Sequence, residues 1–384
     1  MSILGILENA IANLVAIALI AITTYSIIYI KMSGLTKIFR RFLHPEKRVF
    51  ALQPLTISKI ERLKESKFLS PVSKHEQEIL VRFYTLRNNV RLFNGISVRL
   101  DDLHFLDKQK KEAVAKVSKV GFFDFISTNL TVYPANEPVY SLRKQFTSIL
   151  RSIHSFSIIQ QVGSEVHKNG RPRNVLDVLQ NRHLANIVAV SVLIIDSQGK
   201  AGIVQRTKKV AISSGNFGST CAGTVSETDF LEDNPFTACV VREVKEELNL
   251  SIQEMQFDGI VVPKQKMQPI FLYHVHIDQT WEELFPTIQQ ARDISFETLA
   301  FYAVPIEQLI PFAAHCQMTD AAAYQVWQFA KQNGYQRSWY ASILRPIRIN
   351  RFRLPWQGCC HHSQKITVKA KPTLRQSQSK YQSK

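Results

Sequence analysis

The sequence predicts an α/β domain in the second half of the chain, preceded by one transmembrane helix and a mostly helical accessory region. Three observations support this prediction: an uncharged apolar run over residues 9–30, charged amphipathic segments between residues 73 and 120, and strand-like runs that flank an acidic helix after residue 186. A length of 384 residues allows two or three domains. We expect the transmembrane helix in 1–31, an accessory region of unknown role in 32–182, the α/β domain in 183–345, and a basic, disordered tail in 346–384.

The run from Asn9 to Ile30 contains no charged residue and is dominated by Ile, Ala and Leu. This length suffices for one membrane-spanning helix, since about 20 residues cross the hydrocarbon layer. A cleaved signal peptide is the alternative, but no Lys or Arg precedes the run and its apolar part is longer than usual. The basic residues follow it instead: Lys31, Lys37, Arg40, Arg41, Lys47 and Arg48. The positive-inside rule therefore predicts a single-pass protein with its N-terminus outside and its C-terminal domain in the cytoplasm.

The formal net charge of +17 is concentrated after this run and ahead of the tail. Basic clusters beside a membrane helix usually contact anionic lipid. No DNA- or RNA-binding motif accompanies them, so nucleic acid is an unlikely partner. Five cysteines do not form a plausible disulfide framework in a reducing compartment. The adjacent residues Cys359, Cys360, His361 and His362 lack the ligand spacing of a zinc site.

The accessory region gives mixed signals. Ser73–Arg87 and Leu103–Val120 have the spacing of amphipathic helices, and Ser141–Val162 returns to helical spacing. Gly121–Tyr140 is rich in Phe, Thr, Tyr and Pro, which suggests loops and short strands. The region is either a regulatory, sensing or oligomerising domain or a scaffold packed against the α/β domain, and both alternatives stay open.

The α/β domain begins with a buried strand over Asn186–Asp196, which is rich in β-branched residues. The turn Ser197-Gln198-Gly199-Lys200 leads into a returning strand over Ala201–Arg206. Further strand-like runs follow at Phe257–Val262, Pro269–Ile277 and Phe301–Val304.

A helix between these strands is predicted from its two ends. Asn234 followed by Pro235 indicates a helix start, because Asn caps free N–H groups and Pro suits the first helical position. Asn249 tolerates the left-handed conformation in which helices often end. One apolar face is expected from residues at three- and four-residue steps: Phe236, Val240, Val241, Val244 and Leu248.

Another face of this helix carries Glu243, Glu246 and Glu247, at positions i, i+3 and i+4. Neighbouring carboxylates repel one another, and a cation that neutralises them would turn this cost into a binding site. Hard oxygen ligands suit Mg²⁺ or Mn²⁺. The alternative is a solvated, charged helix face.

These residues resemble the Nudix box, whose pattern is a Gly, a spaced Glu, and then Arg-Glu-apolar-x-Glu-Glu-x-Gly-apolar. The matching residues are Arg242, Glu243, Val244, Glu246, Glu247 and Leu250. Asn234 stands where the box has its upstream Glu, and Asn249 replaces its final Gly. The leading Gly matches Gly223 if about five residues are inserted before the helix. With the flanking strands, the resemblance to the Nudix hydrolase family covers about 160 residues and implies a Nudix-type α/β/α sandwich with a mixed sheet.

The resemblance implies a metal-dependent diphosphatase in which water attacks a phosphorus of a nucleoside diphosphate linked to another moiety. Glu243, Glu246 and Glu247 would be the Mg²⁺ or Mn²⁺ ligands, Glu246 and Glu247 catalytic residues, and Arg242 would orient a carboxylate by an ion pair. The catalytic base would come from the box or from a later loop, where Asp293 and Glu297 are the candidates. Arg206 and Gly223 would contact substrate, with Lys208 and Lys209 as further phosphate contacts. The alternative is that Arg206, Lys208 and Lys209 are exposed charges of the hairpin.

Two other functions remain open. The first is a Nudix-fold nucleotide sensor with a transmembrane output helix, for example in bacterial defence signalling. The second is a catalytically silent interaction module, which the crowded glutamates argue against.

Overall fold

The computed structural model describes residues 44–88, 92–107, 111–130, 167–168, 171–172, 175–207, 215–264, 266–335, 347–352 and 364–368. Within these ranges no helix combines the length and apolar character that a membrane crossing needs. The predicted span over residues 9–30, the helix expected at 141–162, Lys208, Lys209 and the cluster at 359–362 lie outside the described residues.

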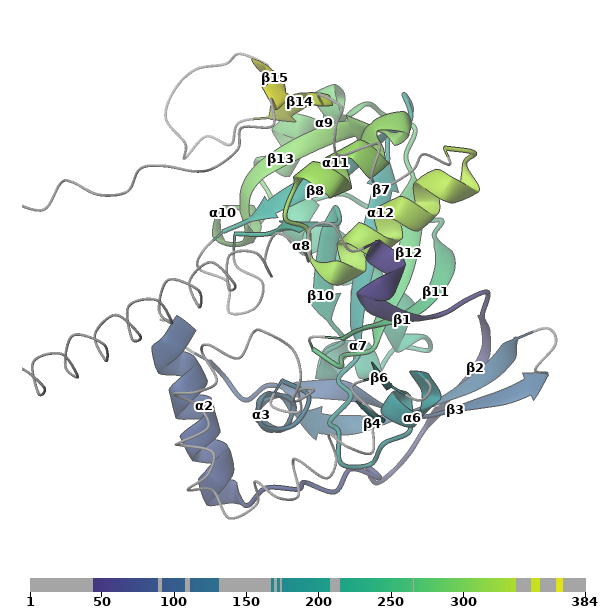
Figure 1. Ribbon diagram of the computed structural model, residues 1–384, viewed down its shortest axis with the longest axis vertical. Helices are drawn as coiled ribbons and strands as arrows, with labels where there is room; N and C mark the ends of the chain where they lie inside the picture. Colours follow the sequence, from purple (N-terminus) through teal and green to yellow (C-terminus); the bar gives the residue numbers. More distant parts are fainter. Residues whose placement is uncertain are drawn as a thin grey trace, which may run out of the picture.

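The largest element is a ten-stranded sheet with the strand order β1-β11-β12-β7-β8-β13-β14-β15, in which β10 pairs with β7 and β9 pairs with β8 (Figure 1). Its strands are β1 (Val49–Leu52), β7 (Ala189–Ile195), β8 (Lys200–Arg206), β9 (Phe217–Gly218), β10 (Cys221–Thr224), β11 (Gln256–Pro263), β12 (Ile270–His276), β13 (Thr298–Pro305), β14 (Ile347–Phe352) and β15 (Gln364–Val368). β12 runs parallel to β7 and the other pairs are antiparallel, which confirms the predicted mixed sheet.

The central strand β7 is buried on both faces. Val190, Val192 and Ile194 belong to one apolar cluster, whereas Leu193 and Ile195 belong to another. Successive side chains of a strand point to opposite faces, so the two clusters lie on opposite sides of the sheet. The first is covered by α8 (Pro235–Leu248), and the second by α11 (Leu309–His315) and α12 (Asp320–Gln332). The predicted α/β/α sandwich is thereby confirmed.

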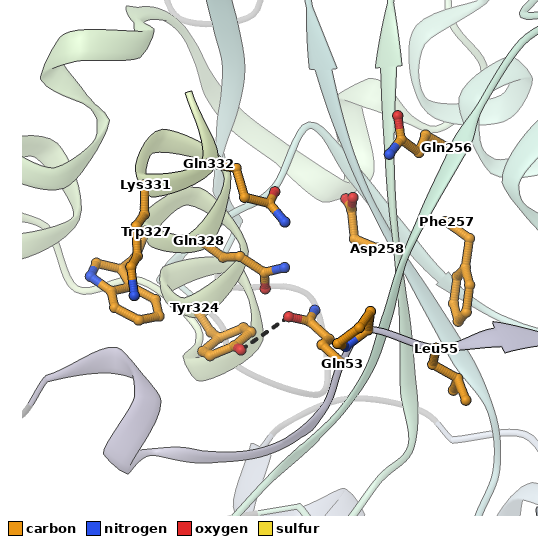
Figure 2. A pocket seen from close by; sticks show the side chains of 11 residues that line it. Gln53, Leu55, Gln256, Phe257, Asp258, Tyr324, Trp327, Gln328, Lys331 and Gln332 are labelled. Atoms are coloured by element: carbon orange, nitrogen blue, oxygen red, sulfur yellow. Dashed lines mark hydrogen bonds between the residues drawn. The ribbon is translucent and has the colours of Figure 1, made fainter. Parts of the chain in front are cut away.

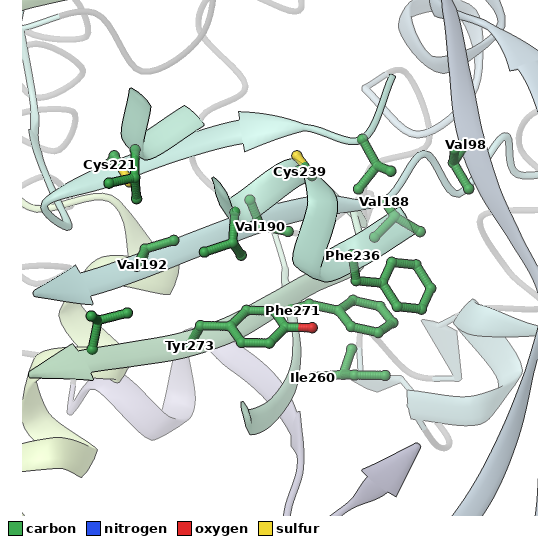
Figure 3. Close-up of a cluster of buried hydrophobic side chains, with 14 of the residues drawn as sticks. Val98, Val188, Val190, Val192, Cys221, Phe236, Cys239, Ile260, Phe271 and Tyr273 are labelled. Atoms are coloured by element: carbon green, nitrogen blue, oxygen red, sulfur yellow. The ribbon is translucent and has the colours of Figure 1, made fainter. Parts of the chain in front are cut away.

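The acidic helix α8 begins and ends where the sequence predicts. The Asn234 side chain accepts hydrogen bonds from the N–H groups of Phe236 and Thr237, at 3.0 and 3.2 Å. Asn249 follows the last turn with φ 56°, in the left-handed region. Phe236 is buried in the apolar cluster that Figure 3 shows. The other predicted apolar residues are also buried, except Val241, which is 43% exposed. Val241 follows the buried Val240 by one residue, a rotation of about 100° that turns it away from the core.

The helix expected over Leu103–Val120 is wrong. β3 (Ile96–Asp107) and β4 (Glu112–Gly121) are antiparallel strands there, and β2 (Thr56–Arg62) pairs with β4 in a separate three-stranded sheet. Ala113, Ala115 and Val117 are fully buried at alternate positions, which is the period of a strand. The loops and short strands expected from Gly121 also give way to a helix, α3 (Phe122–Ser127). The helix predicted over Ser73–Arg87 is confirmed as α2 (Lys74–Asn88).

The accessory region and the α/β domain share one core. β1 extends the main sheet by pairing with β11. The Val98 backbone donates to the Val225 carbonyl at 2.9 Å and accepts from Val188 N–H at 2.8 Å. Arg99, fully buried, pairs with Asp101 and donates to the Leu184 carbonyl at 3.3 Å. The predicted boundary at residue 183 therefore separates segments that pack together.

The remaining elements are short. They are η1 (Pro45–Lys47), β5 (His167–Lys168), β6 (Arg171–Pro172), α6 (Val175–Leu179), α7 (Glu227–Phe230), α9 (Trp281–Ile288), α10 (Ile294–Glu297) and η2 (Ile306–Gln308). The C-terminal segment expected to be disordered contributes β14 and β15, which extend the sheet beyond β13.

Candidate active site

Gly223 on β10 and Glu243 on α8 approach each other closely in the site. A Cβ atom added to Gly223 would lie 1.8 Å from Oε1 of Glu243 and 1.9 Å from its carboxyl carbon. The Glu243 carboxylate therefore lies directly against the Gly223 Cα, and only glycine leaves room for it. Gly223 is held in place by the pairing of β10 with β7, where it lies opposite Val190.

The three box glutamates do not point the same way. Glu243 and Glu247 face β10 and are only 8% and 3% exposed. Glu247 Oε1 accepts a hydrogen bond from the Ala222 backbone N–H at 3.3 Å. Glu246 lies at the rim, where its oxygens pair with Arg242 at 3.0 Å and with Arg292 at 2.9 Å. Helical spacing brings the three together, and the approach of β10 decides which two are buried.

Arg242 connects the acidic helix to the segment before it. Its Nε and Nη2 donate to the Asp229 carboxylate at 2.9 and 2.8 Å, and Nη2 also donates to the Thr224 carbonyl at 3.1 Å. Its Nη1 lies 2.8 Å from Glu243 and 3.0 Å from Glu246. Burial opposes the charge of Arg242, but these carboxylates raise its pKa above the usual value. The guanidinium thus holds two of the box glutamates in place.

Asp229, the partner of Arg242, was not predicted from the sequence. It ends a capping box in which the Ser226 backbone N–H and hydroxyl both donate to Asp229 Oδ2, each at 2.8 Å. Burial raises the pKa of Asp229, and the hydrogen bonds from Arg242 and Ser226 outweigh it, so that the pKa is lowered. The Ser-x-x-Asp pattern is a known helix-start signal and could have located this short helix. It does not reveal that Asp229 pairs with Arg242.

The later loop brings one of its two candidate carboxylates to the site. Glu297 ends α10 and lies 3.7 Å from Nη2 of Arg206, which ends β8. Asp293 instead pairs with Arg292 at 2.9 Å on the surface. The Asp293 backbone N–H donates to the Glu246 carbonyl at 3.1 Å and so ties the loop to the last turns of α8. Glu297 is thus the candidate that joins the box glutamates.

Negative charge in this site is only partly neutralised. Burial raises the pKa of Glu247 well above its usual value, and the charges of Glu297 and Glu243 raise it further. Burial also raises the pKa of Glu243 to about 7, although Arg242 opposes the shift. The pKa of Glu297 is raised by burial too, against the effect of Arg206. Like charges brought together out of water favour a bound cation.

The donor chemistry of these side chains fits a divalent metal. Carboxylate oxygens are the ligands that Mg²⁺ and Mn²⁺ prefer. In the described part of the chain, no three His, Cys, Asp or Glu side chains are already arranged around one point as ligands. The Arg292 side chain that holds Glu246 is 68% exposed, so this ion pair can open at little cost. Glu243, Glu246 and Glu247 are therefore the residues that could hold the ion.

Comparison with known families decides the identity of the fold. Residues 185–319 match the model of the NUDIX domain, a range that contains every residue of the site. This segment is a Nudix domain. The match ends at 319, before α12, and excludes β1, β14 and the accessory sheet. A comparison with curated proteins gives no match.

Solved structures similar to the chain include the following three. DR0079 from Deinococcus radiodurans is 18% identical, with 37% of this chain and 82% of that chain covered and a TM-score of 0.29. MutT from Methanosarcina mazei is 15% identical, with coverages of 38% and 94% and a TM-score of 0.28. The NUDIX domain of NrtR from Shewanella oneidensis, in complex with ADP ribose, is 13% identical, with coverages of 39% and 89% and a TM-score of 0.30.

Proposed function

We propose that the Nudix domain is a divalent-metal-dependent diphosphatase that cleaves a nucleoside diphosphate linked to another moiety. The observation that carries the proposal is the convergence of Glu243, Glu247 and Glu297, whose charges act on one another, with the Glu243 carboxylate directly against Gly223. A structural role alone does not explain several buried carboxylates with so few hydrogen-bond donors, because burying charge without a partner destabilises the fold.

Each side chain has a distinct role in this reaction. Glu243, Glu246 and Glu247 would hold Mg²⁺ or Mn²⁺, which would offset phosphate charge and make water a better nucleophile. Arg242 contacts no substrate and orients Glu243 and Glu246 through the ion pairs described above. Either a box glutamate or Glu297 takes the proton of the attacking water. Glu297 is the better later-loop candidate, since Asp293 is engaged with Arg292.

Arg206 is the candidate for contact with the diphosphate. Its side chain lies at the edge of the carboxylate cluster, and its Nε is buried without a hydrogen-bond partner among the described residues. A guanidinium binds phosphate oxygens with paired N–H donors. A diphosphate bound there would neutralise the arginine while leaving the glutamates to the metal.

The Nudix domain is further proposed to work at the cytoplasmic side of a membrane. This rests on the apolar run over residues 9–30 and the basic residues that follow it. A reporter enzyme that works only in the cytoplasm should be active when it is fused after Lys384. Activity of a reporter that works only after export would reverse the orientation.

The test of the enzyme is a substrate panel. Full-length protein in mild detergent is given Mg²⁺ or Mn²⁺ with ADP ribose, nucleotide sugars and dinucleotides, and phosphate-containing products are measured. We expect metal-dependent cleavage of at least one substrate, and its loss in the double variant Glu246→Gln/Glu247→Gln. Glu254→Gln, which changes an exposed glutamate beyond the helix, is the matched control and should retain full activity. Tight binding of a panel member without turnover would instead favour the nucleotide sensor.

A further inference from the structure

Two histidines lie next to each other at the end of strand β12. His274 and His276 are two residues apart, so their side chains project from the same face of the strand. Their ring centres are 5.6 Å apart, and the ring planes meet at 89°. Two imidazoles that bind one tetrahedral ion have their ring centres about 5 Å apart, because each metal–nitrogen bond is about 2.0–2.1 Å long. The observed separation is close to the one that a shared ion needs.

This histidine pair lies on the face of the sheet away from the carboxylate site. Tyr273 and Val275 belong to the apolar cluster that α8 covers. Leu272, two residues before His274, instead packs with residues of α12. Because side chains alternate along a strand, the two histidines face α12, whereas the box glutamates lie on the side of α8.

A carboxylate fixes the orientation of His274. Its Nδ1 lies 2.8 and 2.9 Å from the two oxygens of Asp258, on the neighbouring strand β11. The Asp258 side chain is only 8% exposed. Metal-bound histidines usually donate one ring N–H to a carboxylate in this way, which fixes the tautomer and leaves the other nitrogen for the metal. The second nitrogen of His274, Nε2, is the one left.

The charge of Asp258 is not compensated by lysine or arginine. Among the described residues, His274 is its only ion-pair partner. Asp258 lines a cavity of about 530 Å³ whose opposite wall carries Lys331 (Figure 2). The ammonium of Lys331 lies 5.2 Å from the centre of the Trp327 ring. The carboxylate is therefore available to offset the charge of a cation bound to His274.

The pair is supported from one side and open on another. The Phe329 ring of α12 lies 5.1 Å from the ring centre of His274 and 6.1 Å from that of His276. Phe329 is itself only 4% exposed, so it is a fixed surface behind both imidazoles. His276 is exposed, which gives an ion access from solvent.

We propose that His274 and His276 form a second metal site, for a divalent transition-metal ion that prefers imidazole, such as Ni²⁺ or Zn²⁺. In the described ranges no third His, Cys, Asp or Glu side chain joins them, so water would complete the coordination. A buried ion pair alone explains His274 and Asp258, but it gives no role to His276. The site differs in chemistry from the carboxylate site, whose oxygen ligands suit Mg²⁺ or Mn²⁺.

The experiment titrates untagged full-length protein in mild detergent with Ni²⁺ by calorimetry at pH 7.5, where imidazole is mostly neutral. Excess Mg²⁺ is present to occupy the carboxylate site. We expect saturable binding that weakens at least tenfold in His274→Gln and in His276→Gln. His75→Gln, which changes an exposed histidine of α2, is the matched control and should bind as its parent does.

The thiols and imidazoles at 359–362 are also good ligands for Ni²⁺, so the parent protein and every variant lack them. The changes made in all samples are Cys359→Ser, Cys360→Ser, His361→Gln and His362→Gln.

Asp258→Asn tests the positioning role of the carboxylate. We expect Ni²⁺ binding to weaken about tenfold or more, as is usual when the partner of a metal-bound histidine is changed. The Glu246→Gln/Glu247→Gln variant should retain Ni²⁺ binding, which separates this proposal from the diphosphatase.

Melting temperatures guard against misfolding. His276→Gln changes an exposed residue, so without Ni²⁺ its melting temperature should equal that of the parent. Ni²⁺ should raise the melting temperature of the parent more than that of His276→Gln. The proposal is overturned if the parent fails to bind Ni²⁺ in excess Mg²⁺, or if His276→Gln binds it as tightly as the parent. It is equally overturned if binding is lost only in the glutamate variant.

Discussion

The Glu243 carboxylate lies against the Cα of Gly223, so close that a methyl group on Gly223 would overlap the carboxylate. This contact links strand β10 to the acidic helix and fixes where one box glutamate points. Because the two residues are 20 positions apart in the sequence, the contact depends on the whole turn between them. It also gives a steric reason for glycine at this point of the motif.

Gly223→Ala should therefore move Glu243 out of place. We expect a loss of hydrolytic activity of about a hundredfold or more, since small misplacements of reacting groups are costly. The measurement is kcat with the best substrate of the panel, together with the melting temperature. Gly218→Ala is the matched control, because a Cβ at this buried glycine of β9 would meet only ordinary contacts, the nearest at 3.5 Å. Equal activity of the two variants would contradict the steric account.

Asp229→Asn should destabilise the domain. The change weakens two charge-assisted hydrogen bonds to Arg242 and leaves a half-buried guanidinium with less compensation. Hydrogen bonds to charged groups contribute about 1.5–3 kcal/mol to stability. We therefore expect the free energy of unfolding, measured in urea, to fall by about this amount. Glu227→Gln, which removes an exposed ion pair with Lys119, should cost well under 1 kcal/mol. A larger loss of stability in Glu227→Gln than in Asp229→Asn would argue against the role given to Asp229.

Metal-free protein should lose stability as the pH rises from about 4.5 to 7. The pKa of Glu243 is about 7 in the folded chain and 4.5 in the reference state. A carboxyl group with a raised pKa favours the folded state at pH values below 4.5, and this contribution disappears as the group ionises near pH 7. The raised pKa of Glu247 acts in the same direction. Urea unfolding in EDTA at pH 5 and at pH 7.5 measures the free energy of unfolding at each pH. The difference between the two values should be smaller in Glu243→Gln.

Arg99→Met should destabilise both parts of the chain together. Arg99 is buried in the accessory region, pairs with Asp101 and donates to carbonyls of the segment that leads into β7. Removing one partner of a buried ion pair typically costs about 3–5 kcal/mol, because the other charge is left unpaired. Limited proteolysis should show the accessory sheet and the Nudix domain becoming sensitive at the same urea concentration. A double change, Arg99→Met/Asp101→Leu, should recover part of the loss.

Local signals made the acidic helix predictable. Asn234, Pro235 and Asn249 mark its ends through interactions with the nearest residues of the chain, and the structure keeps all three in those roles. The strands around it are recognisable because β-branched residues dominate buried strands such as β7. Between Leu103 and Val120, charged residues interrupt the apolar residues at a spacing that is typical of an amphipathic helix. The strands there are held by pairing with β2, which no local pattern reveals.

The site itself was predictable only in part. Helical spacing alone places Glu243, Glu246 and Glu247 near one another. Which two are buried depends on the approach of β10, and the partners of Arg242 and Glu246 come from separate segments. Likewise, Glu297 rather than Asp293 meets the box because α10 ends at Glu297, where β13 begins to pair with β8. These contacts are tertiary and have no signature in spacing.

The most direct test of the central claim is Mn²⁺ binding to metal-free, full-length protein, followed by electron paramagnetic resonance. We predict a saturable site that weakens at least tenfold in Glu247→Gln and is unchanged in Glu254→Gln. Failure of the wild type to bind Mn²⁺, or equal binding by Glu247→Gln, would contradict the assignment of these glutamates to a divalent metal.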